Sequence, residues 1–349
     1  MPQRSYFAAA NGFSGFRSYF EDVFNPKDFL RLYVIKGGPG TGKSSMMKKI
    51  GKHFSTQGYE IEAIFCSSDP NSLDGIIINS KNGKIGVLDG TAPHETDAKI
   101  PGAVDEIINL GNSWNKNLLV ENRGKIIKLN EEKKRHYKNA YEYLKFAGMF
   151  FDTSIRCIKE AYVKNDTQLI NDIIFDIPHL NPSRKNRKRL FSAFGKNGYS
   201  RLDIVHAQGK KQLSIMGSYG SEYIFMSRLV CEIESRGASF IRFISPFAEK
   251  LTEGILLPDT QTFIAVNSDF SEKRDTSLFL DESILTSNKE KLNYYSKEFE
   301  EALSHAKKEF SAASDSHFKL EKIYTSAMNF NEIDDMLEKI TVQIEDLIK

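Results

Sequence analysis

The chain has 349 residues, of which 40% are hydrophobic and 27% charged, and its formal net charge is +2. This length allows two domains or one large one, and the composition excludes intrinsic disorder. The small net charge gives no overall bias toward nucleic acid or an anionic membrane, so neither is an expected partner.

The cysteines and the N-terminal segment bear on the cellular compartment. Cys66, Cys157 and Cys231 lie far apart without CxxC spacing, which predicts neither a disulfide framework nor a zinc site. The segment MPQRSYFAAANGF lacks the long apolar core of a secretion signal, and no run of about 18 apolar residues occurs. We therefore expect a cytoplasmic protein without a membrane span.

The first part of the chain predicts short apolar strands that alternate with helices. Strands are expected at Leu32–Lys36, Tyr59–Cys66 and Ile85–Asp89, with a helix at Lys43–Thr56 and a crossover before the last strand. This order predicts an α/β fold, a three-layer α/β/α domain with a parallel sheet covered by helices on both faces. An added helical region is expected from about 102 to 165.

The segment GGPGTGKS, between the first strand and the first helix, matches the phosphate-loop (P-loop) pattern GxxxxGK[ST]. Average composition gives this pattern by chance in roughly one chain of this length in a hundred. The glycines allow the backbone N–H groups to turn inward, and the helix presents its positive end to phosphate oxygens. The predicted nucleotide-binding residues are Gly37, Gly38, Pro39, Gly40, Thr41, Gly42, Lys43, Ser44 and Ser45.

The expected ligands are ATP and Mg²⁺. Lys43 is predicted to contact the β- and γ-phosphates, and the Ser44 hydroxyl to bind Mg²⁺. Asp89, at the end of the strand in KIGVLDG, is the expected partner acid for the metal, with a turn residue of an Asp-Gly pair as the alternative. Asp69, in FCSSDP, is the competing metal carboxylate, with a helix cap as its alternative.

The catalytic base is not evident from the motif. Gly90 stands where many ATPases have a glutamate directly after the strand acid. We therefore take His94 as a catalytic candidate beside Lys43 and Asp89, with Glu95 and Asp97 nearby and an ordinary loop histidine as the alternative. No NKxD base-reading motif occurs, which favours ATP over GTP.

A basic segment separates two similar halves of the chain. NPSRKNRKR, which starts at Asn181, predicts a boundary near residue 180, with a P-loop half at 1–180 and a second half at 181–349. The halves repeat with an offset of 180 between Gly37 and Gly217 and of 179 between Gly75 and Gly254. We therefore predict an internal duplication.

The second half lacks the residues that bind phosphate. At an offset of 180, GSYGSEYIF replaces the P-loop motif, so that Glu222, Tyr223 and Ile224 stand for Gly42, Lys43 and Ser44, and Asn267 answers Asp89. A carboxylate repels phosphate, and both the cation and the magnesium hydroxyl are missing. The second site is therefore predicted to be silenced.

The second half also ends in helices. Apolar or small residues at helical spacing predict a helix from about Ser287, and a final helix is expected from Asn331. The predicted apolar face of the final helix comprises Ile333, Met336, Leu337, Ile340, Ile344 and Leu347. We expect these helices to pack on each other or on the sheets.

Four segments of the chain resemble a family of bacterial P-loop ATPases of unassigned role, found largely in Gram-positive organisms. They are GGPGTGKSSMMKKIG, CSSDPNSLDGIII, VLDGTAPHETD and PGAVDEIINLG, and the resemblance extends over essentially the whole chain. It implies two tandem P-loop halves, ATP binding and a cytoplasmic location. By position, Gly37–Ser45 are its nucleotide loop, and its characteristic blocks contain Asp69, Asp74, Asp89, His94 and Asp105 without assigned roles.

Together these features predict a Mg-dependent ATPase or nucleotide-driven switch with one active and one silenced site. A basic residue of the second half, Arg228 or Arg242, is a candidate for contacting the γ-phosphate. The alternatives are a small-molecule kinase, suggested by VLDGTAP and the missing glutamate, and a non-hydrolysing scaffold that recruits a partner through its helices. The partner is an unknown protein or small molecule, and a monomer is expected because the second half supplies the pairing that other P-loop proteins obtain by dimerising.

Overall fold

Two six-stranded sheets with the same strand order form the core of the molecule. The computed structural model describes residues 4–93, 95–163, 166–177, 187–202 and 211–349. The first sheet has the order β1 (Arg4–Phe7), β5 (Glu60–Phe65), β6 (Leu73–Asn79), β7 (Lys84–Asp89), β4 (Arg31–Lys36) and β8 (Asp105–Asn109). The second has the order β9 (Arg187–Arg189), β13 (Ile241–Ile244), β14 (Thr252–Leu257), β15 (Thr262–Val266), β12 (Lys211–Met216) and β16 (Glu272–Asp275). The predicted duplication of an α/β unit is therefore confirmed.

Both sheets are mixed, so the prediction of a wholly parallel sheet is wrong. β6 runs antiparallel to β5 and β7, and β14 runs antiparallel to β13 and β15. The segment that was interpreted as a crossover forms strand β6, because a tight turn in which the Ser72 N–H donates to the Asp69 carbonyl returns the chain beside β5. A connection this short permits only antiparallel pairing, whereas a parallel return needs a dozen or more residues.

The elements around the glycine motif lie where they were predicted. β4, β5 and β7 match within a residue at each end, and α2 spans Lys43–Thr56 as expected. The predicted helical region instead begins with β8, which pairs in parallel with β4. Helices follow only at α3 (Lys116–Glu121) and α4 (Arg123–Ala161).

The two faces of the first sheet are covered differently. α2 and the final helix α8 (Phe330–Ile348) pack on one face, where Ile333, Ile340 and Ile344 of α8 are buried with Met47 and Ile50 of α2. The other face is covered by the four-residue α1 (Phe20–Val23) and by aromatic residues up to Phe29, in a core that continues into the second half. The expected third helical layer is thus reduced to one helical turn in the described residues.

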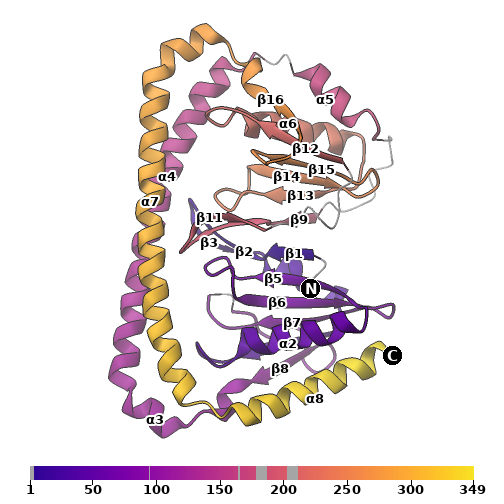
Figure 1. The fold of residues 1–349 in the computed structure, drawn as a ribbon, viewed down its shortest axis with the longest axis vertical. Coiled ribbons are helices and arrows are strands. Elements are labelled where there is room, and N and C mark those ends of the chain that lie inside the picture. The colour runs from indigo at the N-terminus through magenta and orange to yellow at the C-terminus, as the bar shows by residue number, and fades with distance from the viewer. Residues whose placement is uncertain (1–3, 94, 164–165, 178–186, 203–210) are drawn as a thin grey trace.

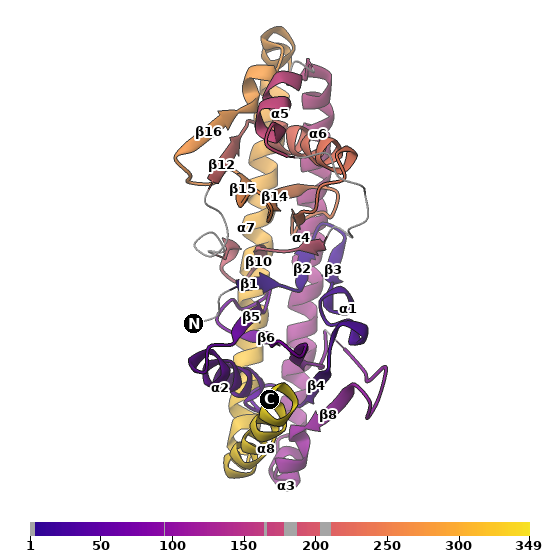
Figure 2. The ribbon, with the colours of Figure 1, turned by 90° about the vertical axis from the view of Figure 1, so that its right-hand side faces the viewer.

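Two long antiparallel helices run between the halves, and each carries the chain from one half to the other (Figures 1 and 2). α4 starts beside the first half and ends at the second, while α7 (Glu282–Ser326) runs the opposite way along it. Beyond α4, α5 (Thr167–Ile174) packs on α6 (Ser221–Ser235) of the second half, as α8 packs on α2 of the first. Each sheet is therefore covered by a helix from the other half of the sequence.

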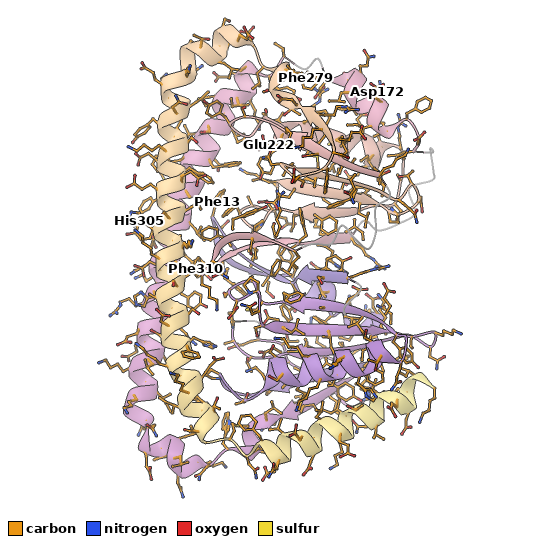
Figure 3. The ribbon with its side chains drawn as sticks, in the orientation of Figure 1. Phe13, Asp172, Glu222, Phe279, His305 and Phe310 are labelled. Carbon is orange, nitrogen blue, oxygen red and sulfur yellow. The ribbon has the colours of Figure 1, made fainter. Side chains whose placement is uncertain are left out.

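The halves also meet directly, edge to edge. The Phe7 N–H of β1 donates to the Leu190 carbonyl at the end of β9 (2.9 Å). Two hairpins, β2 (Ala9–Gly12) with β3 (Gly15–Ser18) and β10 (Ser192–Gly195) with β11 (Gly198–Arg201), lie in the same junction against the long helices, where Figure 3 labels Phe13 and Phe310. The predicted boundary near residue 180 lies outside the described residues.

None of the helices in the described chain combines the length and apolar character needed to cross a membrane.

Candidate functional site

The glycine loop, residues 37–42, joins buried strand β4 to helix α2. Gly40 and Gly42 have φ angles of +69° and +91°, which L side chains rarely adopt. Gly42 caps α2 without a side-chain hydrogen bond, so the N–H groups of the first helical turn remain available to an anion. The Thr41 hydroxyl donates to the Gly38 carbonyl (2.9 Å) and closes the loop on itself.

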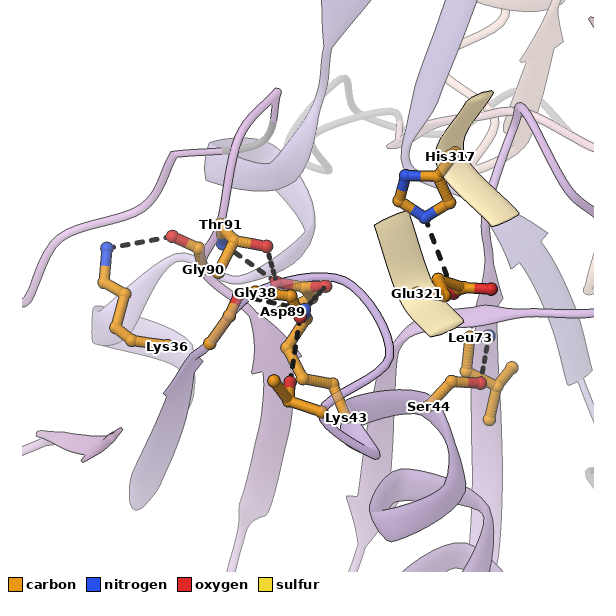
Figure 4. A network of polar contacts seen from close by, with 12 residues as sticks. Lys36, Gly38, Lys43, Ser44, Leu73, Asp89, Gly90, Thr91, His317 and Glu321 are labelled. Carbon is orange, nitrogen blue, oxygen red and sulfur yellow. Dashed lines mark hydrogen bonds and ion pairs between the residues drawn. The ribbon is translucent and has the colours of Figure 1, made fainter. Parts of the chain in front are cut away.

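The Lys43 ammonium group lies within this loop (Figure 4). Its Nζ donates to the Gly38 carbonyl (2.7 Å) and to the Gly37 carbonyl (3.1 Å), and lies 3.6 Å from Asp89 Oδ2. The side chains of Lys43 and Asp89 are only 12% and 15% exposed. The structure thus places a cation and a carboxylate together at the mouth of the loop.

Asp89 makes the contacts of the turn residue that was its alternative interpretation, and its role as a magnesium ligand stays a prediction. It ends β7, opposite Ile35 of the neighbouring parallel strand β4, which carries it to the loop. Its Oδ1 accepts from the Thr91 N–H (2.8 Å) and the Thr91 hydroxyl, as a turn residue does, while its Oδ2 faces Lys43.

Ser44 lies in the first turn of α2, and its Oγ accepts from the Leu73 N–H (2.9 Å). The Ser44 hydroxyl and the Asp89 carboxylate are oxygen donors of the type that Mg²⁺ prefers, so this pair fits the predicted metal. Ser45 is exposed on the same helix. Among the described residues, no cluster of three or more His, Cys, Asp and Glu side chains could hold a metal ion.

The remaining predicted residues have other partners or are not described. Asp69 forms an ion pair with Lys196 of the second half and also accepts from the Asn71 N–H (3.1 Å), so its carboxylate is already engaged. Asp97 pairs with Lys36 (3.0 Å) at the edge of the site. His94 lies outside the described residues, its neighbour Glu95 is exposed, and Asp74 and Asp105 are buried.

Sequence reasoning missed the contribution of α7, which comes from the second half. The Thr325 hydroxyl donates to the Gly40 carbonyl (3.1 Å), and the Tyr324 ring packs against Gly38. One turn earlier, Glu321 pairs with His317, whose Nε2 lies 3.5 Å from its Oε1. The helical spacing could have shown that these residues share one face, but no local signal says which loop that face meets.

The charges of these helices act on one another across the loop. His317 lowers the pKa of Glu321 by its hydrogen bond and charge and Lys43 lowers it further, while burial and the charge of Asp69 oppose them. On α4, burial lowers the pKa of Lys133, and the neighbouring charges of Lys134 and Lys43 add to this effect. The environment of Lys43 is therefore built by both halves.

The two basic residues considered for the γ-phosphate lie elsewhere. Arg228 pairs with the fully buried Asp166, and Arg242 donates to the Thr252 hydroxyl (2.8 Å) within the second sheet. The second half does bring a cation, Lys196 at the tip of the β10–β11 hairpin, to Asp69 of the first half.

The second loop differs from the first in length as well as in composition. Only residues 217–220 separate β12 from α6, against 37–42 in the first half. Strand pairing places Val266 opposite Ile215, as Asp89 is opposite Ile35, so Val266 and not Asn267 is the counterpart of Asp89. Gly220 caps α6 with φ +96°, as Gly42 caps α2 with φ +91°, so Ser221 and Glu222 stand for Lys43 and Ser44. The alignment of Glu222, Tyr223 and Ile224 with Gly42, Lys43 and Ser44 at an offset of 180 is therefore wrong, because the second loop is shorter.

The carboxylate of Glu222 fills the second loop. Glu222 is 5% exposed, and its Oε1 accepts from Asn267 Nδ2 (3.1 Å). Its Oε2 lies so close to Gly217 that a Cβ there would be 2.5 Å away. Burial raises the pKa of Glu222. The loop is therefore occupied by a carboxyl group of its own and has no lysine.

Neither the protein-family models, nor the curated proteins, nor the solved structures with which the chain was compared give a match. The interpretation of the glycine loop therefore depends on the geometry of its own residues.

Proposed function

We propose that this protein is a cytoplasmic P-loop ATPase that binds Mg-ATP at residues 37–45 and uses it as a nucleotide-driven switch, with the second site silenced. The observation that carries the proposal is the position of Lys43. Its ammonium group lies inside a glycine loop, between a buried strand and an uncapped helix, 3.6 Å from a strand-end aspartate. This proposal includes membership of the tandem P-loop family that the sequence resembles.

The chain's own groups account for phosphate binding. The carbonyls of Gly37 and Gly38 hold Lys43 Nζ in the free loop, and phosphate oxygens would replace them as its partners. The N–H groups at the start of α2 would donate to the same oxygens. Ser44 and Asp89 would hold Mg²⁺, which neutralises phosphate charge when bound.

The contacts between the halves support a switch. Helix α7 reaches the loop through Thr325, and the Lys196–Asp69 ion pair links the second half to the turn after β5. A ligand that reorganises the loop would act directly on the Thr325 contact, and α7 would carry the change toward the second sheet. Glu222 supports the silencing of the second site, since a buried carboxyl group occupies the second loop and excludes phosphate from it.

The test measures Mg-ATP affinity by titration calorimetry and phosphate release on the purified full chain. Lys43→Ala removes a charged donor, so we expect affinity to fall by about 10- to 150-fold, the equivalent of 1.5–3 kcal/mol, and phosphate release to be lost. The matched control is Lys49→Ala, which removes a lysine of the same helix that pairs with Asp334 at the surface. Lys43→Met keeps the apolar part of the side chain, so a loss of binding in this variant is not explained by lost packing.

Three outcomes separate the candidate functions. Lys43-dependent phosphate release supports the ATPase. Tight binding without release would refute it and favour the kinase or the scaffold, which a screen for phosphorylated acceptors then distinguishes. Absence of Mg-ATP binding would refute the ATPase, the ATP-dependent kinase and the ATP-binding scaffold.

A further inference from the structure

The last turns of α7 bring a histidine and a glutamate to the glycine loop. His317 and Glu321 face each other one turn apart, with Nε2 of the ring 3.5 Å from Oε1 of the carboxylate. Figure 4 shows this pair above Ser44 and Leu73, on the other side of Lys43 from Lys36 and Gly90. Gly90 follows Asp89 where many ATPases have a glutamate, so an acid that reaches the loop from another element is a candidate for the group that activates water.

Packing fixes the position of Glu321. A Cβ on Gly40 would lie 2.6 Å from the Glu321 carbonyl oxygen and 3.0 Å from its Cα, so helix and loop are in backbone contact. The Thr325 hydroxyl, one turn further on, donates to the Gly40 carbonyl (3.1 Å). These contacts fix the backbone of Glu321 against the loop, so that only its side chain can change conformation. A catalytic group needs a backbone position that is held in this way.

The carboxylate is placed to accept a proton at neutral pH. It is 39% exposed, so water reaches it, and His317 and Lys43 favour its charged form. The charged groups that face it are His317 on its own helix, Lys43 on α2 and Asp69 after β5. A carboxylate that is held ionised and is open to water has the charge and the access of a general base.

The second loop provides an internal comparison. There the other long helix, α4, occupies the position that α7 has at the first loop, and it presents Ile155 and Phe151 to Gly220. Phe151 also packs edge-on against Tyr223 in the first turn of α6 (5.8 Å between ring centroids). The residues that α4 presents to the second loop are thus apolar, whereas α7 carries an acid and a histidine where it meets the first loop.

We propose that Glu321, oriented by His317, is the general base of ATP hydrolysis at the first loop, so that the catalytic carboxylate is supplied by the second half of the chain. The inference rests on the proposed function. The water oxygen forms a bond to the γ-phosphorus and gives its proton to the Glu321 carboxylate. The bond from the γ-phosphorus to the bridging oxygen breaks, its electron pair leaves with ADP, and Glu321 later releases the proton to solvent.

The experiment compares Glu321→Gln with Glu309→Gln in the full chain. Glu309 lies on the same helix, about 18 Å away at 1.5 Å per residue, and also pairs with a histidine, His136 (2.7 Å). We measure Mg-ATP affinity by calorimetry and phosphate release in a single turnover. Glu321→Gln is expected to slow release by about 10²- to 10⁴-fold and to keep the affinity within about twofold, while Glu309→Gln changes neither.

A second variant tests the role of His317. Because His317 lowers the pKa of Glu321, His317→Gln should raise that pKa and move the acidic limb of the pH–rate profile to higher pH. A purely structural role would lower the rate at all pH values without moving the limb.

The outcomes distinguish this inference from the function on which it rests. If the unaltered protein shows no Lys43-dependent release, both are refuted. If that release occurs and Glu321→Gln retains its full rate, or loses affinity in proportion to rate, the ATPase stands and Glu321 is not its base.

Discussion

Gly40 joins the glycine loop to helix α7, and Gly40→Ala tests that contact. The residue has φ +69°, so alanine there is strained by about 1–2 kcal/mol. Its Cβ would also lie 2.6 Å from both the Glu321 carbonyl oxygen and the Thr325 hydroxyl, and forcing an extra carbon into a packed contact costs about 1–3 kcal/mol more. We therefore expect Gly40→Ala to destabilise the protein by about 2–5 kcal/mol.

Two other glycines separate the strain from the clash. Gly15 has φ +101° with nothing within 4 Å of an added Cβ, and Gly42 has φ +91° with its nearest neighbour, Phe330 Cε1, at 3.7 Å. Alanine at either position carries the backbone strain alone. Urea unfolding followed by circular dichroism should place Gly40→Ala about 1–3 kcal/mol below both controls. Equal losses for the three variants would show that α7 does not rest on the loop in solution.

Two further predictions concern the exchanged helix and the second loop. Ile344→Ala, in the buried face of α8, should lower the free energy of unfolding in urea by about 2–5 kcal/mol. Val342→Ala, at a residue that is 50% exposed on the same helix, should change it by no more than about 0.5 kcal/mol. Equal effects would contradict the packing of α8 on the first half. Because burial raises the folded-state pKa of Glu222, the protein loses stability as pH rises from the unfolded value of about 4.3 through that raised pKa. Glu222→Gln should therefore be more stable than the original chain at pH 7, by about 1.4 kcal/mol per unit of pKa elevation, and the two should converge at pH 4. Thermal unfolding at both pH values measures this, and a difference that persists at pH 4 would contradict it.

The glycine loop and the elements on either side of it could be predicted from sequence because their signals are local. The apolar run of β4, the glycines and the amphipathic α2 each act within a few residues, and the structure has α2 at the predicted Lys43–Thr56. The same holds for α8, whose predicted apolar face is the one that packs. The approach of Asp89 to Lys43 was also predictable, since parallel neighbouring strands end at the same edge of a sheet.

The sequence by itself thus determined two copies of an α/β unit, one with a lysine in its loop and one without. Tertiary structure alone decided the direction of β6, the pairing of β8 and the exchange of helices that brings Glu321 and Thr325 to the first loop. It also decided the ion pair of Lys196 with Asp69. An apolar helix face predicts that the helix will be buried, but it does not predict against which sheet, because both sheets offer similar apolar surfaces. The packing of α4 along α7 decides which sheet each terminal helix reaches. This packing joins residues far apart in the sequence, so no local pattern predicts it.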